Sequence, residues 1–444
     1  MNGNSREAVF QEIISLADAM ADRLTARRRD FHKYAETGWF EMRTSSLIAR
    51  RLTELGYEVL TGDQVCKKDS RMGVPSDAEL EKQYERAVSQ GADPEFVERT
   101  RGGMTGVIGI LHCGEGPIVG MRFDIDALGV FESESMEHRP AREGFASVNR
   151  GFMHACGHDF HQTSLLGAAQ LLKEREAELK GTVRLIFQPA EENFQGAYQV
   201  IEAGGLDGVS AIIGYHNNPH LKPGQIGLRS GAIMAGVEQF RVDVKGVSSH
   251  AARPDLGVDT VLVTTTIINN LQQIVARTVS PFESAVLSVT HIEVGNTWNV
   301  LPAAGFFEGT IRTFEPKVRE DVIARFEKVV QATADQFGAQ VDITWGNSPY
   351  VTYNDQTLTP LIFENSKTFA EVIETLPSTG GEDFAAYQKE IPGVFAFIGS
   401  NGEDNAPDWH HDDFLVKDEA LPVAVNYYVE NALFLLDYFK KKGK

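Results

Sequence analysis

Apolar runs that favour β-strands alternate with helical patterns over the first half of this chain. Four such runs, rich in Val, Ile, Leu and Phe, lie at 107–111, 118–123, 182–187 and 211–215. Apolar residues at helical spacing occupy stretches between and after them. This alternation is typical of an α/β fold with a mainly parallel, helix-flanked sheet. Sites in such sheets lie beyond the carboxyl ends of the strands, so the residues that follow each run are the candidates for chemistry.

The pattern changes within the segment 230–347, where strand, helix, strand, strand, helix and strand follow one another. That β-α-β-β-α-β order predicts a compact α+β unit of ferredoxin-like type with both helices on one sheet face. Helix and strand patterns resume after it. We therefore expect two domains: 1–229 together with 348–444 forms one, and 230–347 is inserted into it.

The N-terminal segments before the first apolar run have a different character. Residues 5–55 carry apolar side chains at helical spacing and are predicted to be helical. Residues 62–104 are polar and charged, with a capping box that starts at Ser76. We interpret this second segment as an insertion that shapes a substrate entrance.

Composition excludes several classes of protein. The net charge of the 444-residue chain is −20, which argues against nucleic acid or an anionic membrane as a partner. Three cysteines make no disulfide framework and suit a reducing compartment. No apolar stretch approaches the ~20 residues of a membrane helix, and the N-terminus lacks a hydrophobic signal core. We expect a cytoplasmic protein.

A thiol and three imidazoles lie together within residues 154–161, after the second apolar run. Cysteine and histidine are the side chains that a borderline-soft divalent metal prefers. The alternative is that Cys156 is a buried structural thiol and the histidines are ordinary polar residues. Other strand ends favour the metal interpretation, because Glu191 and Glu192 follow the third run and His216 follows the fourth. Adjacent residues on an extended segment face opposite ways, so one glutamate can bind metal while the other meets the reacting water.

Further candidates lie near the C-terminus and in the inserted segment. The C-terminal imidazole pair at 410–411 can supply one ligand, and spacing alone does not choose between its members. In the inserted segment His250 lies on a loop, whereas Asn299 and Arg312 lie near strand ends, a pair that suits capture of a carboxylate. Backbone amides at Gly381 either bind an anion or simply start a helix.

Six motifs in chain order resemble those of the co-catalytic di-metal amidohydrolases, a metallopeptidase family of aminoacylase and carboxypeptidase type. This family includes hippurate hydrolase, indole-acetyl amino acid hydrolase and bacterial N-acyl amino acid amidohydrolases. The resemblance covers nearly the whole chain. The motifs are HACGHD at 154–159, FQPAEE at 187–192, SHAA at 249–252, NVLP at 299–302, GTIR at 309–312 and GEDF at 381–384.

The resemblance implies a zinc-exopeptidase-like catalytic domain that holds two divalent ions, zinc or manganese. The implied ligands are Cys156, His158, Glu192, His216 and His410. The last of these is chosen over its neighbour because in relatives the ligand lies four residues before an aromatic. His154 and His161 then become supporting or packing residues, and Asp159 becomes a candidate orienter of an imidazole.

The resemblance also implies the remaining roles. Glu191 would be the general base, and His250 would polarise the scissile carbonyl, often in the site of the partner subunit. Asn299 and Arg312 would hold the carboxylate of the substrate, with Gly381 as a further substrate contact. The inserted domain would act as a lid and form the interface of a homodimer, and a heteromer with a related subunit stays open.

The expected activity is metal-dependent hydrolysis of N-acyl or N-aroyl amino acids. Residues 29–39, 70–75 and 144–147 resemble the A subunits of p-aminobenzoyl-glutamate hydrolases, which makes p-aminobenzoyl-glutamate the leading substrate. The C-terminal half resembles a generic aminoacylase, and Asp255 and the pair at 217–218 depart from the common pattern. Three alternatives stay open: a general aminoacylase or dipeptidase, a hydrolase with Cys156 as nucleophile, and a non-catalytic binding protein or subunit.

Overall fold

The computed structural model describes residues 15–346 and 348–443. The chain divides into two compact units. Unit 1 comprises Met1–Ile233, Tyr353–Leu376 and Ala386–Lys444, and unit 2 comprises Met234–Thr352 and Pro377–Ala385. The short segment Pro377–Ala385, which includes Gly381, therefore lies with unit 2.

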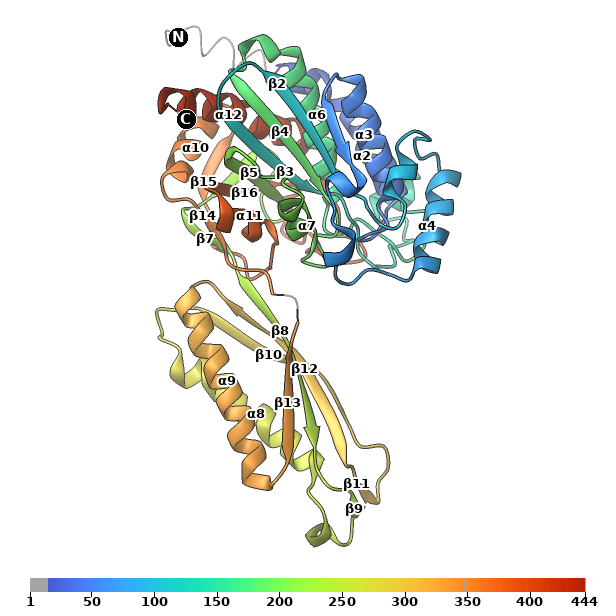
Figure 1. Cartoon of the computed structure of the whole chain (residues 1–444), viewed down its shortest axis with the longest axis vertical. Coiled ribbons are helices and arrows are strands. Elements are labelled where there is room, and N and C mark those ends of the chain that lie inside the picture. The colour runs from blue at the N-terminus through green and yellow to red at the C-terminus, as the bar shows by residue number, and fades with distance from the viewer. Residues whose placement is uncertain (1–14, 347, 444) are drawn as a thin grey trace. The chain divides into compact units, whose positions relative to one another are not determined.

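Unit 1 is built on an eight-stranded sheet of order β1-β2-β4-β3-β5-β16-β6-β15 (Figure 1). The central ladders, β4 with β3, β3 with β5 and β5 with β16, are parallel, whereas β1, β2 and β4 pair in antiparallel fashion. The predicted mainly parallel, helix-flanked sheet is thus confirmed. The strands are β1 (Glu58–Thr61), β2 (Val107–Cys113), β3 (Ile118–Asp124), β4 (Gly181–Gln188), β5 (Val209–Asn218), β6 (Gln225–Leu228), β15 (Glu371–Glu374) and β16 (Gly393–Gly399).

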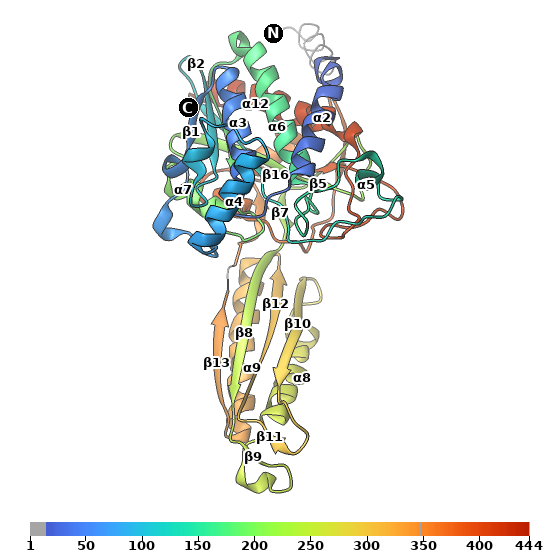
Figure 2. The same cartoon turned by 90° about the vertical axis from the view of Figure 1, so that its right-hand side faces the viewer.

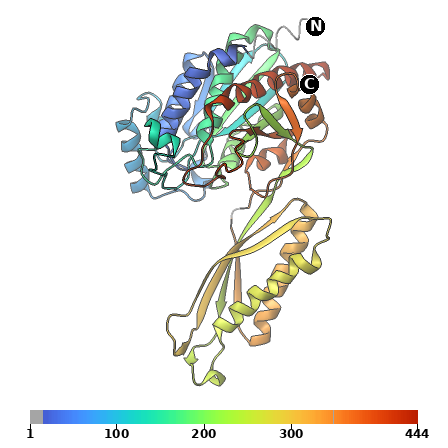
Figure 3. The ribbon, with the colours of Figure 1, turned by 180° about the vertical axis from the view of Figure 1, so that it is seen from behind.

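Two long helices of unit 1, α6 (His158–Glu174) and α12 (Leu421–Lys441), contact each other and strands β3, β4 and β5. Figure 3 shows α12, in dark red, lying across the sheet. Nearly every residue of α6 up to Leu172 is buried, so this helix is held from all sides and its first turn has a fixed position. Among the described residues, no helix is long and apolar enough to cross a membrane.

The remaining helices of unit 1 are shorter. They are α2 (Ala21–Lys33), α3 (Met42–Glu54), α4 (Asp77–Ser89), α5 (Arg139–Glu143), α7 (Gly196–Glu202) and α10 (Leu358–Ser366), with α11 (Phe384–Glu390) starting at the edge of unit 2. The helix predicted over 5–55 is wrong at its centre, because the chain leaves helical geometry between α2 and α3. Trp39, fully buried in that break, has a φ of 68°. Part of the prediction, 5–14, lies outside the described residues.

Unit 2 is a four-stranded antiparallel sheet of order β10-β12-β8-β13 (Figure 2). The helices α8 and α9 contact each other, and both lie on one face of this sheet. This is the predicted β-α-β-β-α-β unit. Its elements are β8 (Gly236–Lys245), α8 (Thr260–Thr278), β10 (Ala285–Val294), β12 (Ala304–Thr313), α9 (Pro316–Phe337) and β13 (Gln340–Trp345), with a separate small ladder of β9 (Ser249–His250) and β11 (Val300–Leu301).

Candidate metal centre

Five side chains of unit 1 gather beyond the ends of β4 and β5 and at the start of α6. Cys156 and His158 come from the turn that opens α6, Glu191 and Glu192 follow β4, and His216 lies near the end of β5. The Cys156 Sγ lies 3.3 Å from His216 Nε2. His158 Nε2 lies 3.8 Å from Glu192 Oε1. Residues far apart in the sequence therefore meet because parallel strands bring their carboxyl ends to one edge of the sheet.

A sixth side chain comes from the loop before α12. His410 Nε2 lies 3.6 Å from Glu192 Oε2, and the His410 backbone N–H donates to the Ala155 carbonyl at 2.8 Å. The φ of His410 is 67°, a left-handed conformation that non-glycine residues rarely adopt. His411 is engaged elsewhere, since its Nδ1 lies 2.6 Å from the carboxylate of Asp413.

The candidate ligand atoms form two overlapping groups that share the Cys156 sulfur. Cys156, His158 and His216 make one group, and Cys156, Glu192 and His410 make the other. Within each group the N, O and S atoms lie within 4.8 Å of one another. A divalent ion binds such atoms at about 2.0–2.3 Å, so side chains this close together can surround a single ion. The cluster thus offers two adjacent candidate positions for a cation.

Hydrogen bonds select which nitrogen of each ring is available. His216 Nδ1 donates to the carbonyl of Asn217 at 2.7 Å, because a carbonyl can only accept. His158 Nδ1 lies 3.2 Å from Asp126 Oδ1 and donates to that carboxylate. In the neutral form of each ring, the lone pair therefore lies on Nε2. His158 Nε2 is buried without a hydrogen-bond partner among the described residues, and so is Glu192 Oε1.

The third histidine of the motif, His161, is fully engaged. Its Nε2 accepts from the backbone N–H of Asn217 at 2.9 Å, and its Nδ1 donates to Asp124 Oδ1 at 2.6 Å. A backbone N–H can only donate, so His161 is a neutral ring with its proton on Nδ1. Burial lowers the pKa of His161 further. Although Asp124, His158 and His161 lie close enough to form a ligand group, the Nε2 of His161 is already occupied.

His154 and Asp159 lie on a separate side of the motif. Asp159 is buried and accepts hydrogen bonds from Arg28 Nη1 at 2.9 Å and from His32 Nδ1 at 3.0 Å. The imidazole that Asp159 orients is therefore His32, on α2. Both ring nitrogens of His154 are buried without a hydrogen-bond partner among the described residues, and burial lowers its pKa to about 3.

Negative charge dominates the cluster. Burial raises the pKa of the Cys156 thiol well above its usual range, and the Glu192 carboxylate raises it further. Burial likewise raises the pKa of Glu192 to about 7. Burial lowers the pKa of His158, but Asp124 and Asp126 outweigh it and raise that pKa to about 10. A nucleophilic cysteine needs the opposite environment, one that lowers its pKa.

The loop that carries Glu191 is fixed on both sides by buried carboxylates. The Ala190 N–H donates to Glu41 Oε1 at 2.8 Å, and the Glu192 N–H donates to Asp126 Oδ2 at 3.0 Å. Ala190 has a φ of 50°, so the chain makes a left-handed turn immediately before Glu191. Glu191 itself is only 4% exposed. These contacts hold the backbone on which its carboxylate is mounted.

Sequence reasoning missed two of these contacts. Glu41 lies in the break between α2 and α3, which the apolar spacing predicted as continuous helix, and no local pattern marks its link to Ala190. Asn217 stood out only as a departure from the family pattern. Its place next to His216, directly after the apolar run 211–215, was a usable signal, because an amide buried at the end of such a strand must find hydrogen-bond partners.

The candidate residues of unit 2 do not all meet. The Ala251 N–H donates to the Asn299 carbonyl at 3.1 Å, and β9 pairs His250 with Val300. Arg312 lies near the other end of β12, with a nitrogen 3.4 Å from the Thr379 carbonyl. The stretch of β12 from Ala304 to Arg312 alone spans about 26 Å. One small carboxylate therefore cannot contact Asn299 and Arg312 of the same chain.

Gly381 is half-buried and precedes the start of α11. The Phe384 N–H in that first turn donates to the side chain of Glu382 at 2.9 Å, so this amide already has an acceptor.

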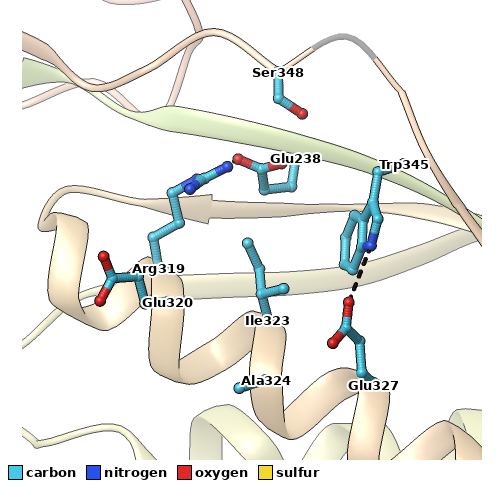
Figure 4. Close-up of a pocket in the computed structure, with 8 residues that line it drawn as sticks. All are labelled: Glu238, Arg319, Glu320, Ile323, Ala324, Glu327, Trp345 and Ser348. Carbon is cyan, nitrogen blue, oxygen red and sulfur yellow. Dashed lines mark hydrogen bonds and ion pairs between the residues drawn. The ribbon is translucent and has the colours of Figure 1, made fainter.

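A separate pocket of about 540 Å³ lies in unit 2 between α9 and the sheet (Figure 4). Its charged groups are partly paired, Arg319 with Glu238 and Glu327 with the Trp345 indole at 3.3 Å. None of the residues that line it is a histidine or cysteine.

Known proteins resemble this chain over three quarters or more of its length. The N-acetylcysteine deacetylase of Bacillus subtilis (strain 168) is 38% identical over 426 residues, which cover 95% of this chain and 99% of that protein. The A subunit of the p-aminobenzoyl-glutamate hydrolase of Escherichia coli (strain K12) is 35% identical over 335 residues, 75% of this chain and 76% of that one. The crystal structure of a Bacillus subtilis protein, described as a dinuclear metal binding peptidase of the M20 family, matches with a TM-score of 0.74 and 36% identity. That match covers 95% of this chain and 99% of the other.

A family model covers most of the chain as well. The model of peptidase family M20/M25/M40 matches residues 120–433, which include every candidate ligand of unit 1 and both glutamates after β4. The structural match with a TM-score of 0.74 agrees with the fold described above. The chain is a hydrolase that belongs to peptidase family M20/M25/M40.

Proposed function

We propose that this protein is a metal-dependent amidohydrolase that cleaves N-acyl or N-aroyl amino acids and holds two divalent cations in unit 1. The observation that carries the proposal is the cluster of a thiol, three imidazoles and a carboxylate around Cys156, with Glu191 beside it. A relative of 36% identity is described as a dinuclear metal binding peptidase, which supports two ions in this chain.

The donor set fits zinc or manganese by three criteria. It combines sulfur, nitrogen and oxygen, which suits a borderline-soft ion. Buried atoms without hydrogen-bond partners among the described residues, His158 Nε2 and Glu192 Oε1, lie toward one another, 3.8 Å apart. The carboxylates that raise the pKa of Cys156 supply the negative charge that cations would neutralise. The ligands would be Cys156, His158, Glu192, His216 and His410.

The chain's own residues then divide the chemistry. Two bound ions would lower the pKa of water toward ~7 and polarise the amide carbonyl. Glu191 would accept a proton from the attacking water and pass it to the departing amine. The hydrogen bonds from Ala190 to Glu41 and from Glu192 to Asp126 hold the backbone on each side of Glu191, which keeps that carboxylate oriented. Burial of Cys156, His158, Glu191 and His216 keeps bulk water from these groups, whereas the side chain of His410 is 55% exposed.

Unit 2 would complete the site from a second copy of the chain. The roles that we propose for His250 and Asn299 are to polarise the carbonyl and to bind the substrate carboxylate with Arg312. Because Asn299 and Arg312 lie near opposite ends of β12, joint binding of one carboxylate requires residues from two chains. We therefore propose a homodimer with unit 2 as lid and interface, and Gly381 as a further substrate contact.

We propose two candidate substrates, an acetylated amino acid and p-aminobenzoyl-glutamate. The relative with 38% identity over 95% of this chain is an N-acetylcysteine deacetylase, which favours an acetylated amino acid. A p-aminobenzoyl-glutamate hydrolase subunit with 35% identity over 75% of this chain supports the aroylated alternative. A screen of acetyl-, benzoyl- and p-aminobenzoyl-amino acids separates them, and activity on acetyl-amino acids with none on p-aminobenzoyl-glutamate removes the second. Assay of the purified chain alone also tests whether a related subunit is needed.

Chelation followed by metal add-back tests the core of the proposal. We expect dialysis against a chelator to abolish hydrolysis, and stoichiometric zinc or manganese to restore it, with two ions bound per chain by elemental analysis. Full hydrolysis by a metal-free preparation would refute the proposal. A trapped acyl-enzyme on Cys156, detected by mass spectrometry, would favour the nucleophilic alternative instead.

A further inference from the structure

We infer that Asn217 is a positioning residue of the candidate metal centre, which holds the main chain of Cys156 and the ring of His216 at the same time. This inference rests on the proposed function of the cluster. Asn217 follows His216 at the end of β5 and is completely buried. It has no place among the candidate ligands.

Each polar group of Asn217 has a partner in or beside the cluster. Its side-chain Nδ2 donates to the carbonyl of Cys156 at 2.6 Å and lies 3.0 Å from His161 Nε2. Its backbone N–H donates to the same nitrogen at 2.9 Å. Its carbonyl accepts from His216 Nδ1 at 2.7 Å, and its Oδ1 accepts from Ser400 Oγ at 3.2 Å. One residue therefore connects two candidate ligands that lie 60 positions apart.

The backbone next to Cys156 is shaped for this contact. Gly157 has a φ of 84°, and a Cβ built on it would lie 2.5 Å from the Nδ2 of Asn217. Glycine is therefore required here both for the left-handed turn and for the close approach of the amide. The turn that presents Cys156 and the first residue of α6 is thus fitted around the side chain of Asn217.

The direction of the hydrogen bonds explains what the residue does. Asp124 accepts from His161 Nδ1, which leaves His161 Nε2 as an acceptor for the two N–H groups of Asn217. Asn217 is held in this way, and its carbonyl keeps the proton of His216 on Nδ1. The lone pair of His216 Nε2 then faces the Cys156 sulfur at 3.3 Å, as metal binding requires. The side-chain amide of Asn217 thus holds the main chain of Cys156, and the main-chain carbonyl of Asn217 orients the ring of His216.

Substitution by aspartate tests this with little change of shape. In Asn217→Asp the carboxylate cannot donate, so acceptor oxygens would face the Cys156 carbonyl and the His161 lone pair. We expect the affinity for Zn²⁺, measured by competition with a chromogenic chelator, to fall by about 10–100-fold. We also expect the thiolate-to-metal charge-transfer band of the Co²⁺-substituted protein to shift or weaken, because the Cys156 sulfur is displaced. Neither readout depends on turnover.

The neighbouring Asn218→Asp is the matched control. It makes the same change of charge one residue away, at a half-buried side chain whose Oδ1 accepts from the His220 N–H, a contact that aspartate keeps. We expect wild-type affinity and spectrum for this variant. If Asn217→Asp does not fold, Asn217→Ala decides by the same readouts, since it removes the donation to Cys156 and keeps the backbone contacts.

The outcomes separate the two levels of the proposal. Zinc affinity within twofold of wild type and an unchanged Co²⁺ spectrum in the folded Asn217 variant would overturn the role of Asn217 alone. Equal losses in the Asn217 and Asn218 variants would also overturn it, because the effect would then come from charge. A wild-type protein that binds no zinc or cobalt would instead refute the proposed function.

Discussion

The side chains nearest Cys156 in unit 1 and the His250 side chain in unit 2 are presented in opposite ways. In unit 1 the side chains of His158, His216 and Cys156 are buried, and the two histidines have one ring nitrogen occupied by a hydrogen bond. In unit 2 the side chain of His250 is exposed, and its Nδ1 accepts from the Ala252 N–H only two residues away. Trp298, beside Asn299, is 91% exposed.

The two units therefore differ in how firmly their candidate side chains are held. Unit 1 carries candidate ligands, of which His158 and His216 are oriented by hydrogen bonds to other residues, so under the proposed function this part of the site is preorganised. The backbone of His250 pairs with Val300, but the hydrogen bond to its exposed ring comes from the Ala252 N–H only two positions away. We therefore expect substitutions in unit 1 to act through orientation and metal binding, and those in unit 2 to act only when a second copy is present.

The largest effect is expected from the proposed base in unit 1. Glu191→Gln removes proton transfer but keeps size, so kcat should fall by about 10²–10⁴-fold while two ions per chain are retained. Turnover with metal content by elemental analysis is the measurement. Near wild-type kcat in the metal-loaded variant would remove Glu191 from its role and shift the base to another group.

A slightly smaller loss is expected in unit 2. His250→Ala should lower kcat by about 10²–10³-fold, the usual cost of losing one donor to a developing oxyanion. Exposed His291, on β10 and paired with Glu308, gives the control variant His291→Ala, with wild-type turnover expected.

Mixing the two inactive proteins tests whether unit 2 acts in the partner's site. Hybrid dimers of Glu191→Gln and His250→Ala contain one site with both wild-type groups, so part of the activity should return after subunit exchange. No recovery, with exchange verified by mass spectrometry, would place His250 in the site of its own chain or outside catalysis.

The support of Glu191 predicts a third, intermediate effect. Glu41→Ala leaves the Ala190 N–H buried without its acceptor and frees the left-handed turn, so kcat should fall by about 10–100-fold. Glu41→Gln keeps an acceptor oxygen and should recover most of that loss. Equal kcat for the two variants, or a change confined to KM, would show that Glu41 does not act through Glu191.

The smallest effect on turnover is expected from His32, which should show its role in stability. Burial lowers the pKa of His32, but Asp159 and Glu132 outweigh it and raise that pKa from 6.5 to about 9. Because the folded form binds the proton more tightly, this stabilisation, about 3 kcal/mol, is fully present below pH ~6.5 and is lost as pH rises through ~9. The melting temperatures of wild type and His32→Gln should differ most at low pH and should converge as the pH rises through about 9.

Exposed His411 provides the comparison for that experiment. His411→Gln removes a surface ion pair with Asp413, which contributes about 0–1 kcal/mol. Its melting curve should follow wild type at every pH. A His32→Gln curve that runs parallel to wild type across the whole range would contradict the raised pKa.

Much of the fold followed from local patterns. The apolar runs at 118–123, 182–187 and 211–215 became β3, β4 and β5 within a few residues, because buried strands need continuous apolar stretches. The break between α2 and α3 could not be predicted from local patterns, since apolar spacing carries no information on the φ of Trp39. The hydrogen bond between Glu41 and Ala190 was equally invisible, as it joins residues 149 positions apart.

The residue types that follow the strands, and their order, are legible in the amino-acid sequence: a thiol and imidazoles after one apolar run, paired carboxylates after another and a histidine after a third. The family resemblance favoured His158 over His161, and the physical reason for that preference lies in the tertiary structure. His158 and His161 lie one helical turn apart on α6, so no spacing rule separates them. Asn217, from a distant strand, occupies the Nε2 of His161, while the Nε2 of His158 stays without a partner among the described residues. A histidine becomes available to a metal through the hydrogen bonds that its other neighbours make, and the fold supplies those neighbours.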